Sequence, residues 1–396
     1  MHKYHYQLNI KKFLNNRYND LVIADTFRDF ALSLAALYIP IFLLENGFSL
    51  FDICYYEFAL FVVCIFSHYF VLTYLPKWGI KRSLIVSYLL TIVFYITLYF
   101  SKDLISDLGK LSFLFFITVF NAIPSALYWS AHHVYFIETT DGKNDGKKLG
   151  ILVGIPTILC IASPFIGSLI ITNYNFYGSF IISMILMVFA SWVLTFSNDI
   201  VSDSQLEIKK IIDKNSMRKN LIFILQGIGY SATSFIWPVL LFLMSVKLIS
   251  LGFLFLFSNI VSAATTYLGG KNSDTKGSRK IGRIGATGHG LSLIFRVLSN
   301  TIFTMTAFQT MGGFFGGLLD MALDSSFFKH SHKDIANSIM NREFYMYIGR
   351  IILLIILIVS LNFLSPIKAF ASSIIIAGIT TFLLNLVIKT DQSIIN

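Results

Sequence analysis

Charged residues are scarce in this sequence. Only 13% of its 396 residues are Asp, Glu, Lys or Arg, while 55% are hydrophobic, and the mean hydropathy is +0.71. Soluble proteins carry roughly 25% charged residues. A chain so poor in charge cannot cover its apolar surface with polar groups in water, so we expect a lipid bilayer to be its solvent. The low proline count, 7, also argues against a disordered chain.

Cysteines and enzyme motifs are equally sparse. The three cysteines, Cys54, Cys64 and Cys160, lie in apolar runs without CxxC spacing, so we interpret them as small buried residues, with no disulfide and no metal site. The sequence has no HExxH, GxSxG or P-loop motif. We therefore expect no enzyme activity and no cofactor, and the missing P-loop favours an ion gradient over ATP as the energy source.

Long hydrophobic runs dominate what is present. A membrane-spanning helix needs roughly 20 mostly apolar residues. Such runs predict an all-α polytopic membrane protein of about twelve transmembrane helices, with the turn near Ser299–Asn300 the least distinct boundary. The runs lie near 21–44, 51–75, 83–101, 111–137, 149–172, 176–197, 219–243, 248–269, 283–303, 304–328, 343–364 and 368–389.

The net charge of +10 reflects topology and does not indicate nucleic-acid binding. With the N-terminus placed in the cytoplasm, 24 of the 31 Lys and Arg residues fall in predicted cytoplasmic segments and four on the opposite side. Cytoplasmic loops of membrane proteins carry such an excess. We therefore predict an integral protein of the plasma (inner) membrane with both termini in the cytoplasm.

The two halves of the chain match at a constant offset of 198 residues. The aligned pairs are Pro40 with Pro238, Gly79 with Gly277, Lys81 with Arg279, and Arg82 with Lys280. This predicts two parallel six-helix repeats, with a binding site at their interface near the middle of the membrane. The predicted units are a cytoplasmic N-terminal arm (1–20), an N-terminal six-helix bundle (21–197), a cytoplasmic linker (198–218), a C-terminal six-helix bundle (219–390) and a cytoplasmic tail (391–396).

The loop after the eighth predicted span carries a family motif. Gly270, Asp274, Gly277 and Arg279 stand at the spacing G-x-x-x-D-x-x-G-x-[RK]. The chain thus resembles the major facilitator superfamily, both in this loop and in its arrangement of six plus six helices. The first-half copy, with Gly79, Lys81 and Arg82, has Leu72 and Pro76 where Gly and Asp would stand. The resemblance implies a loop that locks one conformation through ion pairs, a monomer, and a central cavity lined by the first, fourth, seventh and tenth helices.

A second resemblance lies in the fifth predicted span. Its spacing resembles the antiporter signature of the same superfamily, G-x8-G-x3-G-P-x-x-G. Gly150, Pro164 and Gly167 match this signature, while Leu159 and Ser163 stand where two of its glycines would be. The match slightly favours export. The alternative interpretation is a proline-kinked face of small residues that packs against another helix.

Ionisable residues inside spans are expensive and are candidates for function. Asp25, Arg28 and Asp29 are spaced by three and four residues and share one face of the first helix. Arg28 can neutralise one carboxylate, which leaves the other able to take up a proton. The same trio can instead be a structural ion pair.

The fourth helix ends in a group of aromatic and histidine side chains. Tyr128 and His132 are separated by four residues, as are Trp129 and His133. Because histidine titrates near physiological pH, a buried His beside a carboxylate can relay protons. Alternatively, these residues lie at the membrane surface.

The seventh and tenth helices complete the predicted cavity. Asp320 and Asp324 share one face of the tenth helix, and Arg350 of the eleventh is a possible partner for either. The seventh helix offers groups that can bind or stack on a solute, or simply pack between helices: Gln226, Tyr230, Ser234 and Trp237.

Together these features predict a secondary active transporter that moves a small organic solute by alternating access. We expect proton coupling, and export by antiport is favoured over uptake by symport of a solute or metal chelate. A receptor or assembly partner built on the same fold, which does not transport, remains an alternative. An intramembrane enzyme that uses His132 or His133 lacks a recognisable nucleophile or metal site.

Overall fold

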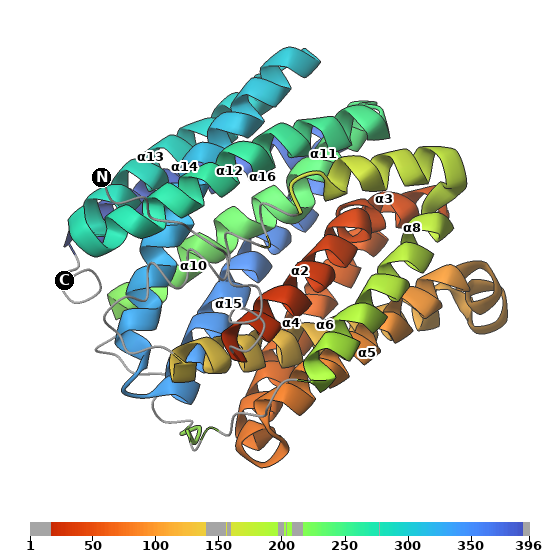
Figure 1. Cartoon of the computed structure of the whole chain (residues 1–396). Coiled ribbons are helices and arrows are strands. Elements are labelled where there is room, and N and C mark those ends of the chain that lie inside the picture. Colours follow the sequence, from red (N-terminus) through yellow and green to blue (C-terminus); the bar gives the residue numbers. More distant parts are fainter. Residues whose placement is uncertain are drawn as a thin grey trace, which may run out of the picture.

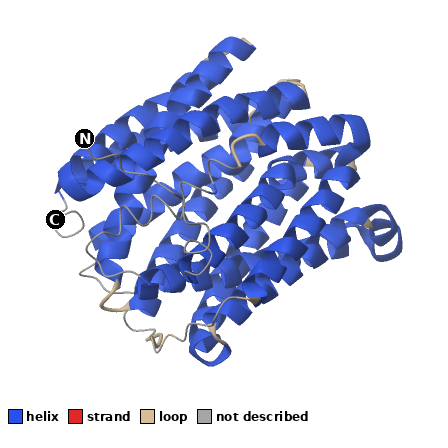
Figure 2. Cartoon of the chain, viewed as in Figure 1, coloured by secondary structure: helices blue, strands red, loops and turns tan. Residues whose placement is uncertain are grey.

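A computed structural model of the chain is helical throughout its described part, in which no strand occurs (Figure 2). The structure describes residues 17–139, 160–196, 217–276 and 278–390, together with Pro156, Ser202 and residues 204–207. The predicted N-terminal arm, most of the linker and the C-terminal tail fall outside these residues, so their boundaries stay predictions.

The first half begins with a broken helix and continues with long ones. Its elements are α2 (Arg17–Ala35), the 3-10 turn η1 (Ala36–Tyr38), α3 (Ile39–Glu45), α4 (Leu50–Trp78), α5 (Ile80–Tyr99), α6 (Ser101–Thr139) and α8 (Ser163–Thr195). Pro40 lies in the first turn of α3. Because proline has no amide hydrogen, it fits the first turn of a helix, where that hydrogen would have no partner within the helix.

The second half starts with a helix that is interrupted in the same way. Its elements are α10 (Met217–Ser231), the π turn η3 (Ala232–Ile236), α11 (Trp237–Leu243), α12 (Leu248–Lys276), α13 (Ser278–Val297), α14 (Ile302–Ser331), α15 (Ile335–Leu361) and α16 (Pro366–Thr390). Pro238 lies in the first turn of α11, as Pro40 does in α3. The predicted proline pair therefore marks the same break in both halves.

Local sequence sets the helix ends. The side chain of Ser49 caps α4 and that of Thr301 caps α14, each with a reciprocal contact from the third residue of its helix. Gly79 separates α4 from α5 with φ +85°, a conformation that favours glycine. The predicted turn near Ser299–Asn300 is confirmed, because α13 ends at Val297 and α14 begins at Ile302.

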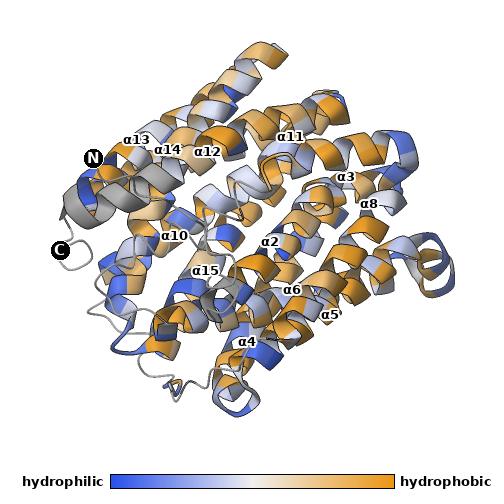
Figure 3. Ribbon diagram, viewed as in Figure 1, coloured by the Kyte–Doolittle hydropathy of each residue, from blue (hydrophilic) through white to orange (hydrophobic). Residues whose placement is uncertain are grey.

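Ten described helices are long and apolar enough to cross a membrane. Hydrophobic residues predominate along the helices, and hydrophilic residues gather near their ends and in the connecting segments (Figure 3). Helix α8 turns sharply at Asn175, whose φ is +60°, so it supplies parts of both the fifth and the sixth predicted spans. Helix α13 has the length of a span but is rich in glycine and carries basic residues. With these two features, the helices accommodate the twelve predicted spans.

Some predicted boundaries were wrong. The eleventh span was expected to begin at 343, but α15 begins at Ile335. The ninth was expected to extend to 303, but α13 ends at Val297. The eleventh span was predicted to begin too late because hydropathy does not register the polar first turns of a helix. The ninth was predicted to run too far because apolar residues, Leu298, Ile302 and Phe303, continue across the turn.

Helix packing repeats between the halves. In the first half, α5 packs against α6 and α8, α4 against α6, and α2 against α8. In the second half, α13 packs against α14 and α16, α12 against α14, and α10 against α15 and α16. These are the same contacts moved on by six spans. The packing therefore repeats in the two halves, as the predicted duplication requires.

The halves meet along two main helix pairs, α4 with α15 and α8 with α12 (Figure 1). At the second pair, a side chain on Gly252 of α12 would clash with Ser168 of α8, so only glycine allows this approach. The described part of the linker also joins the halves. Ser202 donates a hydrogen bond to Glu138 at 2.6 Å, and Ser204 accepts one from the amide of Ala336 at 2.9 Å.

Candidate functional site

A cavity of about 490 Å³ lies where the two halves face each other. Its lining comes from α6 of the first half and from α10, η3, α12, α14 and α15 of the second. We call it the central cavity. It is lined by Ser125, Trp129, His132, His133, Tyr230, Ser234, Ser262, Thr266, Gly317, Asp320, Met321, Asp324, Phe328, Arg342, Glu343, Met346, Tyr347 and Arg350.

An ion pair lies on the wall supplied by α14 and α15. Nη2 of Arg342 is 2.7 Å from Oδ1 of Asp324. Nη1 of the same guanidinium lies 3.1 Å from Nε2 of His133, which belongs to α6. Arg342 therefore links a carboxylate of its own half to a histidine of the other half. Its guanidinium also lies over the ring of Phe327, 4.8 Å from the centroid.

Glu343, the next residue of α15, makes a second connection between the halves. Its carboxylate oxygens lie 3.6 Å from Nε2 of His133 and 3.7 Å from Nε2 of His68 in α4. All three side chains are buried, and Nδ1 of His68 lies 2.9 Å from the hydroxyl of Ser130. A buried carboxylate between two imidazoles can hold or pass a proton, because each imidazole can be neutral or charged.

Asp25 of α2 lies behind the histidines in a polar group of its own. The hydroxyls of Tyr128 and Tyr88 donate hydrogen bonds to its Oδ1 at 2.9 and 3.3 Å. Oδ2 lies 3.1 Å from Nε2 of His132. The rings of Tyr128 and His132 are stacked, with centroids 5.2 Å apart. A buried carboxylate of the first helix therefore contacts a histidine of the fourth helix.

Arg28 and Asp29 form a neighbouring ion pair. Nη1 of Arg28 lies 2.8 Å from Oδ1 of Asp29. The guanidinium also covers the ring of Tyr128, with Cζ 3.3 Å from the centroid, and lies 5.7 Å from that of Trp129. Arg28 is buried, whereas Asp29 is 39% exposed. The stacking of Arg28 on these two rings holds α2 against α6.

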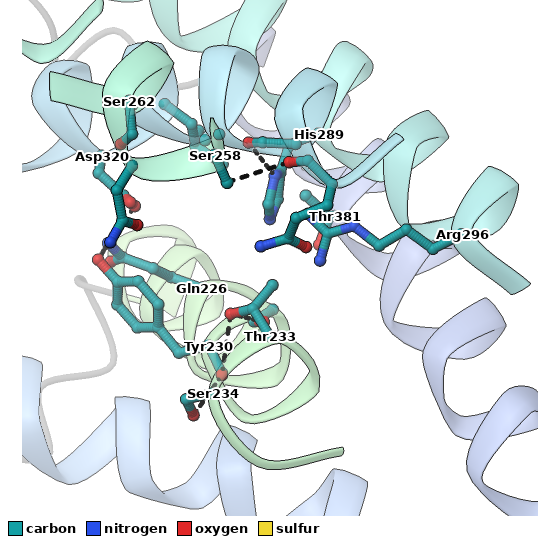
Figure 4. Close-up of a pocket in the computed structure, with 18 of the residues that line it drawn as sticks. Gln226, Tyr230, Thr233, Ser234, Ser258, Ser262, His289, Arg296, Asp320 and Thr381 are labelled. Carbon is teal, nitrogen blue, oxygen red and sulfur yellow. Dashed lines mark hydrogen bonds between the residues drawn. The ribbon is translucent and has the colours of Figure 1, made fainter. Parts of the chain in front are cut away.

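Asp320 connects the central cavity to a smaller cavity inside the second half. The hydroxyl of Tyr230 donates a hydrogen bond to Asp320 at 3.0 Å, and Gln226 donates one to Tyr230 at 3.3 Å. The smaller cavity, of about 240 Å³, lies among α10, α12, α13, α14 and α16 (Figure 4). We call it the side cavity. Ser234 and Asp320 line both cavities, as does Tyr230.

Two expectations about the cavity need correction. The first helix was expected to line it, but among the described residues around the central cavity none comes from α2. Asp25 instead touches His132, a lining residue, from behind. Arg350 was a possible partner for Asp320 or Asp324, but Arg342 pairs with Asp324. Arg350 lies eight residues, about 12 Å, farther along α15, where it packs over the ring of Tyr347.

Other predicted residues have separate places. Trp129 lines the central cavity, and Gln226 lines the side cavity. Trp237 lines neither cavity and is fully buried, with the guanidinium of Arg296 5.7 Å from its ring.

Sequence reasoning missed most of the connection between the halves. Arg342 fell in a predicted loop because the eleventh span was expected to begin one residue later. Glu343 and His68 fell inside predicted spans, and no contact between them was expected. Periodicity within a helix offers no signal that these residues meet, since His68 precedes Arg342 by 274 residues. The one available clue was the cost of placing Glu and His within apolar helices.

The loop motif residues act partly as helix caps. Lys81, at the start of α5, donates a hydrogen bond to the carbonyl of Thr195 at the end of α8. Arg279, at the start of α13, donates in the same way to the carbonyls of Ile388 and Lys389 near the end of α16. Such carbonyls have no partner within their own helix. Each half is therefore fastened at the same place by an aligned basic residue.

The remaining loop residues divide between described and undescribed positions. Gly79 provides the turn between α4 and α5, and Arg82 is exposed. Gly270 and Asp274 belong to α12, but their surroundings lie outside the described part of the chain, and so does Gly277. The expected ion-pair network around Asp274 stays a prediction.

The motif of the fifth span lies at helix contacts. Gly150 is outside the described residues. Ser163 starts α8, the carbonyl of Pro164 accepts a hydrogen bond from Tyr38 at 2.6 Å, and a side chain on Gly167 would clash with the carbonyl of Leu34. These contacts hold α8 against the broken first helix. They fit the interpretation as a packing face.

The described part of the chain holds no group of three or more His, Cys, Asp and Glu residues suited to a metal ion. Its chemistry is that of a polar cavity, where carboxylates, imidazoles and guanidinium groups lie beside aromatic rings inside a hydrophobic helix bundle. Such a cavity can bind a solute and exchange protons. It offers no activated nucleophile.

The sequence pattern of the Major Facilitator Superfamily matches residues 104–354, which is more than half of the chain. The chain belongs to the major facilitator superfamily. It is accordingly an integral membrane protein and a secondary transporter of small molecules, in a superfamily whose members are transporters and not enzymes. A comparison with curated proteins finds no match.

Proposed function

We propose that this transporter exports a small organic solute in exchange for protons. In this proposal it acts as a monomer in the plasma membrane, with both termini in the cytoplasm. The observation that carries the proposal is the continuous set of ionisable groups at the central cavity. Asp324, Arg342, His133, Glu343 and His68 follow one another within 2.7–3.7 Å and join both halves.

Alternating access would use this connection as a latch. We infer that the bundles 21–197 and 219–390, joined by the linker 198–218, rock about the cavity. Separation of α15 from α4 and α6 would break the contacts of Glu343 with both histidines. Proton uptake or release by these groups changes the attraction between the two halves. It thereby biases the equilibrium between the inward-facing and outward-facing states.

The lining chemistry suits a polar organic solute. A cavity of about 490 Å³ lies within the usual range for small-molecule sites, roughly 300–1,000 Å³. Trp129 and Tyr347 offer aromatic faces, and Asp320 and Arg350 offer charges of both signs. A solute with an aromatic or apolar body and one or two polar groups would use all of these features.

The test compares metabolites inside and outside cells that lack the protein, express it, or express Asp320→Asn. Asp107→Asn is the matched control, since Asp107 is exposed near the start of α6. We expect at least one solute to be depleted from cells that express the wild type or the control, and a protonophore to abolish the difference. Asp320→Asn should lose it at equal expression.

The alternatives give different results in the same experiment. Accumulation inside the cells would indicate uptake by symport. A redistribution that survives the protonophore would overturn proton coupling. If no solute moves with the wild type, a receptor or assembly partner on the same fold becomes the better interpretation.

A further inference from the structure

Arg296 is a buried cation inside the second half, away from the central cavity. It belongs to the last turn of α13 and is 2% exposed. Its side chain reaches inwards, so that the guanidinium faces the side cavity beside His289 (Figure 4). Glycine at position 312 of α14 makes room for the guanidinium, because any side chain there would clash with Nη2 of Arg296.

No protein carboxylate neutralises this charge within the described residues. Nε and Nη1 of Arg296 have no hydrogen-bond partner among them. Asp320 is the one carboxylate that lines the side cavity. It lies eight residues beyond Gly312 on the same helix, which corresponds to about 12 Å, and it accepts a hydrogen bond from Tyr230. Burying an unpaired charge is among the costliest arrangements in a protein.

The surroundings supply further polar atoms without partners. Oγ1 of Thr381 and the side-chain oxygen of Gln309 line the same cavity and have no hydrogen-bond partner in the described part of the chain. The side chain of His289 uses Nδ1 to contact the carbonyl of Gly312 at 3.1 Å. Unpaired polar groups from α13, α14 and α16 therefore converge on a single hollow.

We infer that the side cavity binds a small anion against the guanidinium of Arg296. The ligand class is a halide-sized ion or a carboxylate group, which the cavity of about 240 Å³ accommodates together with water. An anion would neutralise the arginine and take hydrogen bonds from its free Nε–H and Nη1–H and from the hydroxyl of Thr381. This site is additional to the central cavity, but Tyr230, Ser234 and Asp320 line both, which gives the anion a route of entry.

Trp237 provides a direct reporter for this site. Its ring lies 5.7 Å from Cζ of Arg296 and is fully buried. With Trp78, Trp129 and Trp192 replaced by Phe, Trp237 is the sole tryptophan of the purified protein. Iodide, a heavy-atom quencher, should then quench its fluorescence saturably, whereas caesium ions should not. Chloride and formate should compete with iodide.

The matched variants separate charge from folding. Arg296→Gln should weaken iodide binding about tenfold or more, and Arg296→Lys should weaken it less. Arg283→Gln, on the same helix but hydrogen-bonded to Asn385, should leave it unchanged. Wild-type protein should also melt at a higher temperature in chloride than in a bulky sulfonate of equal ionic strength, and Arg296→Gln should lose this difference. Linear quenching, or equal quenching in Arg296→Gln, would overturn the inference.

A second comparison distinguishes the source of the anion. If a resident inorganic ion fills the site, replacing chloride by the sulfonate should lower the solute export of wild-type cells. If the carboxylate of the solute fills it, export should survive that replacement, and the solute should compete with iodide at Trp237. The fluorescence measurement needs no transport, so it can fail or succeed independently of the proposed exchange with protons.

Discussion

Glu343→Gln should loosen the latch between the halves. The substitution keeps the size of the side chain and removes the charge that lies 3.6 Å from Nε2 of His133 and 3.7 Å from Nε2 of His68. When His68 carries a proton, it attracts the carboxylate at 3.7 Å by about 4 kcal/mol at an effective dielectric constant of about 20. Desolvation of two buried groups cancels most of that, so we expect a net loss of about 1–2 kcal/mol. The equilibrium should therefore shift about tenfold towards the state in which α15 has left α4 and α6.

The assay measures a distance between the halves. Spin labels at Lys77, at the end of α4, and Lys333, just before α15, are both exposed and outside the latch. The three native cysteines are first replaced by serine. Pulsed EPR should show a minor, longer distance in the wild type that becomes the major one in Glu343→Gln. The control is Glu45→Gln, an equal change of charge at an exposed position of α3.

The refuting result is equally concrete. If Glu343→Gln is folded, with the wild-type melting temperature, and its distance distribution matches that of Glu45→Gln, Glu343 does not hold the halves together. The latch would then have to be assigned to the pair of Arg342 with Asp324 or to helix packing alone.

Three further predictions concern the framework of the site. Gly349→Ala places a methyl group against the carbonyl of Ile224 on α10, so we expect a loss of about 2 kcal/mol or more, seen as a lower melting temperature. Arg279→Gln removes the hydrogen bonds to the end of α16 and should lower the free energy of unfolding by about 1 kcal/mol, seen as a lower melting temperature. The exposed Arg82→Gln should leave the melting temperature unchanged. Tyr128→Phe removes one hydroxyl from a buried carboxylate, and should reduce solute export at unchanged expression. Normal export in this variant would show that the group around Asp25 is structural.

Much of the fold could be predicted from the sequence because a bilayer limits the possible structures. A spanning segment must satisfy its own backbone hydrogen bonds, so long apolar runs become helices. The offset of 198 residues also had structural meaning, since Pro40 and Pro238 interrupt equivalent helices, and Lys81 and Arg279 fasten equivalent helix ends. Hydropathy could not define the polar turns at helix ends, which is why Arg342 appeared to belong to a loop.

The candidate site was predicted in composition but not in pairing. Asp25 and His132 were expected to line one cavity from two helices, but the sequence did not indicate that they meet at 3.1 Å. Choosing between Arg342 and Arg350 as the partner of Asp324 required the rotation and start of α15, and these depend on packing against α10 and α4. A pattern within one helix can indicate which residues share a face. It cannot indicate which face of another helix lies opposite.

Charge balance explains why the two cavities differ in what they can bind. Around the central cavity, carboxylates and cations occur side by side, as Asp324 and Arg342 do. A proton can therefore bind or leave there while each charged group keeps a partner of opposite charge or a hydrogen bond. Among the described residues of the side cavity, no carboxylate lies within hydrogen-bond reach of Arg296, and no proton transfer to a neighbour relieves the charge at neutral pH because a guanidinium keeps its proton. A mobile anion is the remaining way to neutralise it. Arg296→Gln should accordingly preserve the folded protein, because it removes a buried charge that no described carboxylate compensates. Arg342→Gln should destabilise the protein by leaving Asp324 unpaired.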